Sequence, residues 1–358
     1  MKRRKNRIIS TALLFLLAFA PGIGQEESAG EDFIFKTEVH VDLLLHALAH
    51  MDLGDDDANL HSEGYVGTIL KEKQTLGLKA DLKARMDALK DVFISDTGIG
   101  GLRNIDFLPF YITGYNEFID GLNWLAADSE DHHKNPRIES FKRYITRQEQ
   151  RKFLKALSGI LDEEYRTFYR DYWKREQERL ADVRRQFEGF VRTKGEKLFS
   201  PVIRKEKKGA EVYLCLSMTR WGRGFRSKDR FGAAVKFPEK WEEFLGVLIT
   251  AVHEMTHQFS DALVMKAEGM DRSQSDTAAG SEGYRVHLAS EYGVFYAEYL
   301  LFRKFLPEYL NDYCLFLLDA FGKDVKDRSP EELDKAFRAI IDLSDKSIAA
   351  ITDYINKL

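Results

Sequence analysis

The sequence predicts an α+β protein that is mostly helical and contains one small mixed sheet. Apolar residues recur at three- and four-residue spacing through most of the chain, which is typical of amphipathic helices. Short β-branched or aromatic runs follow Gly195, and such runs indicate strands. An apolar stripe from Trp241 to Val252 then predicts a further helix. The sheet is therefore expected just before this helix, with helical parts towards both ends of the chain.

The predicted elements divide the chain into segments of different character. These are a signal peptide at 1–24, a linker and start of the mature chain at 25–36, a helical N-terminal region at 37–196, a core at 197–306 and a C-terminal helical region at 307–358. Within the core, the runs predicted as strands are 202–204, 211–219 and 231–237.

The first residues have the pattern of a secretory signal. The positive charges precede an apolar stretch over 8–20 that is too short to span a bilayer comfortably. Cleavage after Ala20 or near Gly24 fits the pattern. We therefore expect an exported protein, periplasmic or secreted, with no stable membrane insertion after the signal is cleaved. The charged residues are Lys2, Arg3, Arg4, Lys5 and Arg7.

Composition limits the function classes. The chain has 358 residues, 44% of them hydrophobic, which is enough for a substantial core. Its net charge of -4 combines both signs throughout, which argues against a nucleic-acid-binding protein. The cysteines, Cys215 and Cys314, could pair in an exported protein or remain as buried thiols. The oligomeric state stays open.

A first group of histidines lies in the helix predicted over 37–51. His46 and His50 are four residues apart, and His40 precedes them by about a turn and a half. This spacing would allow a metal site, but no acidic residue occupies a general-base position beside them. Ordinary packing of this helix is the favoured interpretation.

The strongest chemical signal is the run His253-Glu254-Met255-Thr256-His257. Residues four apart lie on one face of a helix, so His253 and His257 can direct their rings at one ion. Two neutral imidazoles can hold Zn²⁺ and leave room for a water molecule, whose pKa the metal lowers towards neutrality. A carboxylate beside that water can take its proton, which is the role predicted for Glu254.

Zinc requires a third protein ligand. The metzincin pattern would need a glycine and a histidine where the chain has Ser260 and Leu263, so that class is excluded. A glutamate from a later helix is the other common solution. We favour Glu291, with Glu282 and Glu298 as alternatives, because its helical neighbours are mostly apolar and a carboxylate buried among them needs a partner.

These residues resemble a gluzincin-type zincin metallopeptidase. The run from Glu291 to Tyr296 is similar to the Glu-Gly-Leu-Ala-x-Tyr stretch of that family, with its glycine displaced by one place; the run from Glu282 to His287 keeps the glycine. The resemblance covers 211–306. The layout also resembles uncharacterised secreted bacterial zincin-like proteins. The resemblance implies a zincin-like fold, with a small sheet before the active-site helix.

The resemblance implies an exported zinc-dependent metallopeptidase that acts on a peptide or protein substrate, with Glu254 as general base. It also implies an edge strand that pairs with the substrate, for which 232–235 is the candidate. Two alternatives stay open: a zinc amidase acting on a non-protein substrate such as cell-wall peptide, and a non-catalytic binding protein on a zincin scaffold. The candidates for transition-state or supporting roles are Tyr284, His287, Tyr292, Tyr296 and Glu298.

Overall fold

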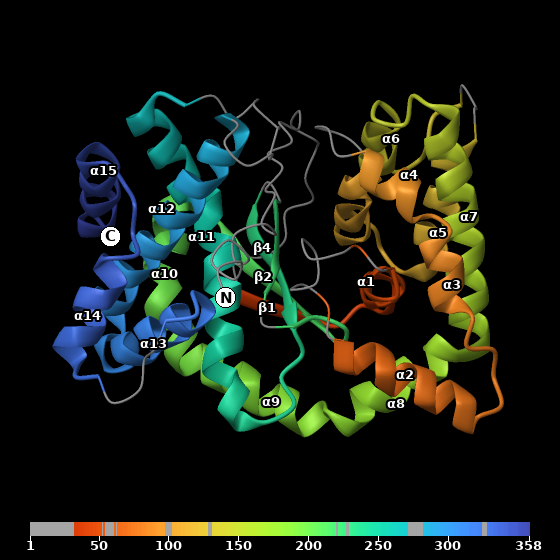
Figure 1. The fold of residues 1–358 in the computed structure, drawn as a ribbon, viewed down its shortest axis with the longest axis horizontal. Helices are drawn as coiled ribbons and strands as arrows, with labels where there is room; N and C mark the ends of the chain where they lie inside the picture. The colour runs from red at the N-terminus through yellow and green to blue at the C-terminus, as the bar shows by residue number, and fades with distance from the viewer. Residues whose placement is uncertain are drawn as a thin grey trace, which may run out of the picture. The chain divides into compact units, whose positions relative to one another are not determined.

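The structure is a computed structural model, and its described part is mostly helical with a small mixed sheet (Figure 1). This confirms the α+β class. The predicted signal peptide at 1–24 and most of the linker lie outside the described residues. The described residues are 32–51, 53, 61, 63–96, 102–127, 131–219, 221–226, 229–270, 282–323 and 328–358.

The chain forms two compact units, and each contains segments that are distant in sequence. The first comprises Met1–Lys36, Val183–Tyr213 and Gly222–Leu358. The second comprises Thr37–Asp182 and Leu214–Trp221. The helix that carries the His-Glu motif, the sheet residues next to it and the helix that carries Glu291 all belong to the first unit.

The sheet has the strand order β1-β2-β4-β3. Strand β1 runs parallel to β2, and β3 runs antiparallel to β4. Among the described strands, β1 and β3 therefore lie at the two edges of the sheet, and β4 is the neighbour of β3. The bounds are Phe33–Lys36 for β1, Gly209–Cys215 for β2, Arg223–Arg226 for β3 and Arg230–Lys236 for β4.

This order makes the prediction of an edge strand at 232–235 wrong, because these residues lie in β4, between β2 and β3. Their small side chains serve internal packing instead. A Cβ atom at Gly232 would lie 2.3 Å from the ring of Phe225 on β3. Glycine is needed there so that the aromatic ring can lie across the neighbouring strand.

Two further differences concern the ends of the sheet. Residues 202–204, predicted as a strand, lie inside α10 (Glu196–Glu206). Leu198 and Val202 are both fully buried and are one helical turn apart, so this apolar run continues a helical face. Strand β1 was not predicted at all, and it pairs Phe33 with Ala210.

The first unit is built around two long helices, α11 (Phe244–Glu268) and α12 (Glu282–Phe305). Helix α11 contacts β3 and β4, and it also packs against α12 and α15 (Asp345–Asn356) (Figure 1). The other helical segments of this unit are α9 (Ala181–Phe190), π-helical η3 (Val191–Gly195), α10, η4 (Trp241–Glu243), η5 (Pro307–Tyr309), α13 (Leu310–Ala320) and α14 (Pro330–Arg338).

The second unit is helical, and its central helix α1 packs against α3, α5, α7 and η1. The bounds are α1 Val39–Ala49, α2 Glu63–Thr75, α3 Leu82–Asp87, α4 Lys90–Ser95, η1 Leu102–Tyr111, α5 Tyr115–Ala126, α6 Pro136–Lys142, α7 Gln148–Glu164, π-helical η2 Tyr165–Tyr169 and α8 Arg170–Arg179.

The histidines of α1 make hydrogen bonds within this unit. Nε2 of His40 lies 3.1 Å from the carbonyl oxygen of Pro109. His46 lies between the hydroxyl of Tyr65 at 2.8 Å and the carboxylate of Glu164 at 3.1 Å. Nδ1 of His50 donates to the carbonyl oxygen of His46 at 2.8 Å. These contacts agree with the packing interpretation of the three residues.

Cys215 and Cys314 are both buried free thiols, so the disulfide alternative is not adopted. Burial raises the pKa of the Cys314 thiol to about 12, which makes the thiolate rare at neutral pH. Among the described helices, we find no segment with both the length and the apolar character needed to cross a bilayer.

Candidate metal centre

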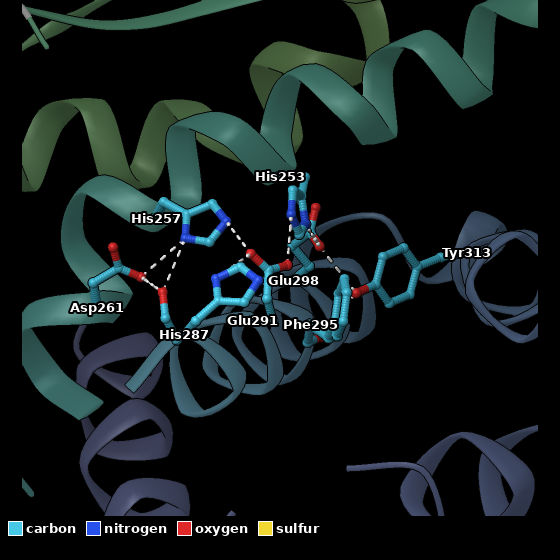
Figure 2. A network of polar contacts seen from close by, with 9 residues as sticks. His253, His257, Asp261, His287, Glu291, Phe295, Glu298 and Tyr313 are labelled. Carbon is cyan, nitrogen blue, oxygen red and sulfur yellow. Dashed lines mark hydrogen bonds and ion pairs between the residues drawn. The ribbon is translucent and has the colours of Figure 1, made fainter. Parts of the chain in front are cut away.

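Three predicted ligand residues come together between the two long helices (Figure 2). His253 and His257 lie one turn apart on α11, and Glu291 approaches from α12. Nε2 of His253 is 3.4 Å from Oε2 of Glu291, and Nε2 of His257 is 3.4 Å from Oε1 of the same carboxylate. One nitrogen or oxygen atom from each residue lies within 4.8 Å of the others.

These separations are compatible with one shared cation. Bond lengths of about 2.0–2.2 Å to imidazole nitrogen and carboxylate oxygen place neighbouring ligand atoms of a tetrahedral ion about 3.3–3.6 Å apart. Each imidazole has one oxygen of Glu291 at 3.4 Å, with His253 facing Oε2 and His257 facing Oε1. The group is also removed from solvent, with exposures of 6% for His253, 0% for His257 and 8% for Glu291. The described residues therefore form a buried group that could hold a metal ion.

Two atoms of the group have no hydrogen-bond partner in the described part of the chain. They are Nε2 of His257 and Oε1 of Glu291, both buried. A buried polar atom without a partner is costly, so native structures supply one in most cases. These two atoms face each other at 3.4 Å, and a cation bound by the group would be a partner for both, so the residues are compatible with a metal ion.

The ring of His253 is oriented by a second carboxylate. Its Nδ1 donates to Oε2 of Glu298 at 3.2 Å, and the hydroxyl of Tyr313 donates to the same oxygen at 3.1 Å. Because Nδ1 is engaged by Glu298, Nε2 is the ring nitrogen that faces Glu291 and is available to a metal ion. A histidine ligand whose other nitrogen donates to a carboxylate is the usual arrangement in metal sites.

His257 has an equivalent partner on its own helix. Its Nδ1 donates to Oδ1 of Asp261 at 3.0 Å, one turn further along α11. The hydroxyl of Ser290 on α12 donates to the same oxygen at 2.6 Å. The Nε2 atoms of both rings thus face Glu291, and each ring is held at Nδ1 by a buried acid.

The electrostatics of the group favour positive charge. Burial lowers the pKa of His253, but Glu298 and Glu291 outweigh burial and raise this pKa well above its ordinary value. Burial raises the pKa of Glu291, but the two imidazoles outweigh burial and hold it well below its usual range. Burial raises the pKa of Glu298. The carboxylates thus create a negative potential at the point where a cation would bind.

Glu254 lies beside this group and against the sheet. It is 4% exposed. A Cβ atom at Gly224 of β3 would lie 3.1 Å from Oε2 of Glu254, so the carboxylate lies directly against the backbone of the edge strand. The residue predicted as general base thus contacts the edge strand β3.

The other predicted residues divide into near and distant ones. Nδ1 of His287 is 4.0 Å from Oε1 of Glu291, on the preceding turn of α12 (Figure 2). The hydroxyl of Tyr296 instead lies 3.3 Å from the Thr352 hydroxyl on α15. Tyr292 is half-buried, and its pKa is raised by burial and by Asp342 and Tyr284, neither of which belongs to the metal group. His287 is therefore the nearest of these residues for a supporting role.

Glu282 is the first residue of α12, nine residues before Glu291. At 1.5 Å per residue, this places the two backbone positions about 13 Å apart along the helix axis. Its side chain lies outside the described part of the structure. The structure therefore brings Glu291 to the two histidines, and it uses Glu298 as a hydrogen-bond acceptor for His253.

Sequence reasoning missed Asp261, Ser290 and Tyr313. The sequence does contain an indication for Asp261, because this residue follows His257 by four positions and must therefore lie on the same helix face. Ser290 and Tyr313 reach the site only through the packing of α12 and α13, and their positions in the sequence give no indication of it.

Comparisons of this chain with known protein families, curated proteins and solved structures find no match. The interpretation of the site therefore depends on its own geometry: two imidazoles and a carboxylate, all buried, with one ligand atom from each within 4.8 Å of the others.

Proposed function

We propose that the protein is a zinc-dependent metallopeptidase of the gluzincin type. His253, His257 and Glu291 would hold Zn²⁺, and Glu254 would act as general base. The observation that carries the proposal is the pair of 3.4 Å separations between Glu291 and the two imidazoles. Two histidines and one glutamate form a ligand set that is typical of catalytic zinc with an open fourth position.

When bound, Zn²⁺ would supply Lewis acidity that lowers the pKa of water and polarises a carbonyl oxygen. Glu254 would take the proton of the attacking water and pass it to the nitrogen of the leaving amine. The oxygen of the water would form a new bond to the carbonyl carbon, and the carbon–nitrogen bond would then break. The products would be a carboxylic acid and an amine. His287, beside Glu291, is our candidate donor to the developing oxyanion.

The choice of a peptide substrate is supported by the place of β3. This strand lies at a sheet edge, and its residue Gly224 contacts Glu254. An extended peptide can add to such an edge through main-chain hydrogen bonds, which requires little of its side chains. A substrate bound in this way would lie beside the general base. The signal pattern at 1–24 adds the proposal that the protein acts after export.

The test is cleavage of a diverse peptide mixture by the mature protein, compared with Glu254→Gln at matched zinc content. Glutamine keeps the shape of the side chain and removes its basicity, so cuts made by the wild type are expected to disappear in the variant. The absence of cuts by a zinc-loaded wild type would reject the peptidase and favour an amidase or a binding role. Equal cleavage by both proteins would reject Glu254 as the base.

A further inference from the structure

The contact between Glu254 and the edge strand depends on missing side chains. A Cβ atom at Gly222 would lie 2.7 Å from Cγ of Glu254, 3.0 Å from Cγ2 of Thr250 and 3.0 Å from the carbonyl oxygen of Ala234 on β4, so its tightest contact is with Glu254. A Cβ atom at Gly224 would lie 2.8 Å from the carbonyl oxygen of Glu254. Thr250 and Glu254 are one turn apart on α11, so Gly222 fits the groove between them.

Backbone conformation does not explain these glycines. The described glycines with positive φ are Gly77, Gly114, Gly269 and Gly322, so neither Gly222 nor Gly224 is among them. An alanine could adopt either backbone conformation but would collide with α11. What both positions require is the close approach of the strand backbone to the helix.

An independent contact holds the strand to the helix at the same place. The side-chain amide of Gln258 donates to the carbonyl oxygen of Phe225 on β3 at 3.0 Å and to that of Gly232 on β4 at 3.3 Å. The guanidinium of Arg226 donates to the carbonyl oxygen of Gln258 at 3.4 Å. Gln258 directly follows His257, so these bonds fix the strand to the part of α11 that carries the site.

We infer that β3 and the preceding Gly222 are a positioning element for Glu254, in which Gly222 sets where the carboxylate lies and Gln258 holds the strand in place. The inference deepens the proposed function, since the group positioned is the proposed base. Gly222 contacts the middle of the Glu254 side chain, which must move if a methyl group is added. Gly224 contacts helix backbone, so a change there would displace the whole strand.

The kinetic test is Gly222→Ala. A displacement of a reacting group by about 1 Å can reduce a rate on the order of 100-fold, so kcat should fall by about that factor while KM and zinc content stay unchanged. The matched control is Gly246→Ala on α11, where a Cβ atom would meet Phe316 at an ordinary 3.5 Å. Gln258→Leu, which releases the strand without adding a clash, should lower kcat in the same way. Unchanged kcat in an active Gly222→Ala protein would overturn the inference.

A stability test needs no activity and separates this inference from the proposed function. Gly222→Ala is introduced beside Glu254→Gln, which keeps Cγ, and beside Glu254→Ala, which removes it. The fall in the urea midpoint should be larger with glutamine than with alanine, because alanine removes the tightest contact and leaves those with Thr250 and the carbonyl oxygen of Ala234. An equal fall in both backgrounds would show that Gly222 does not set the position of residue 254. A wild type that cleaves nothing would reject the proposed peptidase activity. The stability measurements would still show whether Gly222 contacts residue 254.

Discussion

Asp261 accepts a hydrogen bond from Nδ1 of His257 at 3.0 Å, and both side chains are fully buried on the same face of α11. A histidine held by a carboxylate in this way keeps one tautomer and one ring orientation, and it becomes a stronger ligand. Because the two residues lie one turn apart on α11, the helix itself places the carboxylate that supports this proposed zinc ligand.

Replacement of Asp261 by asparagine should weaken zinc binding by about 10–100-fold, because the neutral amide is a weaker acceptor than the carboxylate and leaves His257 a weaker ligand. The variant should still fold, because asparagine keeps an oxygen that can accept from His257. Competition with a chromogenic chelator measures the change. The control is Asp353→Asn, an exposed residue paired with Lys357 on α15. Affinities that agree within twofold would show that Asp261 does not support the site.

We expect the packing of α12 on α11 at Gly293 to affect metal binding by Glu291. A Cβ atom there would lie 2.4 Å from Cγ2 of Val264 on α11, a buried and stiff side chain. Gly293→Ala should therefore destabilise the protein by about 1–3 kcal/mol through overpacking. It should also weaken zinc binding, because it pushes α12, and with it Glu291, away from α11.

Denaturation in urea and chelator competition measure the two effects of Gly293→Ala. Val264→Ala in the same chain removes the colliding methyl group and should restore much of both. A double variant no better than Gly293→Ala alone would show that the loss does not arise at this contact.

The second unit should lose stability in acid through His50. Burial, together with the neighbouring His46, lowers the pKa of this histidine to about 3. The unfolded chain takes up a proton near pH 6.5, whereas the folded chain does not until about pH 3. The stability cost is therefore absent above pH 6.5 and grows as the pH falls. Between pH 7 and pH 4.5 it should reach about 2–3 kcal/mol.

His50→Asn should reduce this acid loss, because asparagine can still donate to the carbonyl oxygen of His46 but does not titrate. Urea unfolding of both proteins at pH 7 and pH 4.5 measures the difference. The control is His132→Asn. His132 is exposed, and Glu139 raises its pKa, so its contribution has the opposite sign. An acid loss that is the same in His50→Asn and the wild type would contradict the assignment.

The local parts of the fold could be predicted from sequence. The helix through His253 and His257 depends on spacing within one segment, and the mostly helical class depends on periodicity. The order of the strands could not be predicted in this way. The small residues of β4 suit an edge as well as an interior, and only the pairing of β4 with both neighbours decides between them.

The third ligand illustrates the same limit. Glu291 and Glu298 are two turns apart on one face of α12, so periodicity predicts that both lie near α11. In the structure, Glu291 faces Nε2 of His253 and Glu298 faces Nδ1. This arrangement depends on the offset of α12 along the axis of α11. Close contacts such as that of Gly293 with Val264 fix this offset, and they appear only in the packed structure.

We propose that His253, His257 and Glu291 form a zinc centre. The most direct measurement is zinc content per chain after dialysis, in the wild type, Glu291→Gln and Glu282→Gln. We predict about one zinc ion per chain in the wild type and in Glu282→Gln, and almost none in Glu291→Gln. A wild type that retains no zinc, or a Glu291→Gln variant that retains as much as the wild type, would contradict the account.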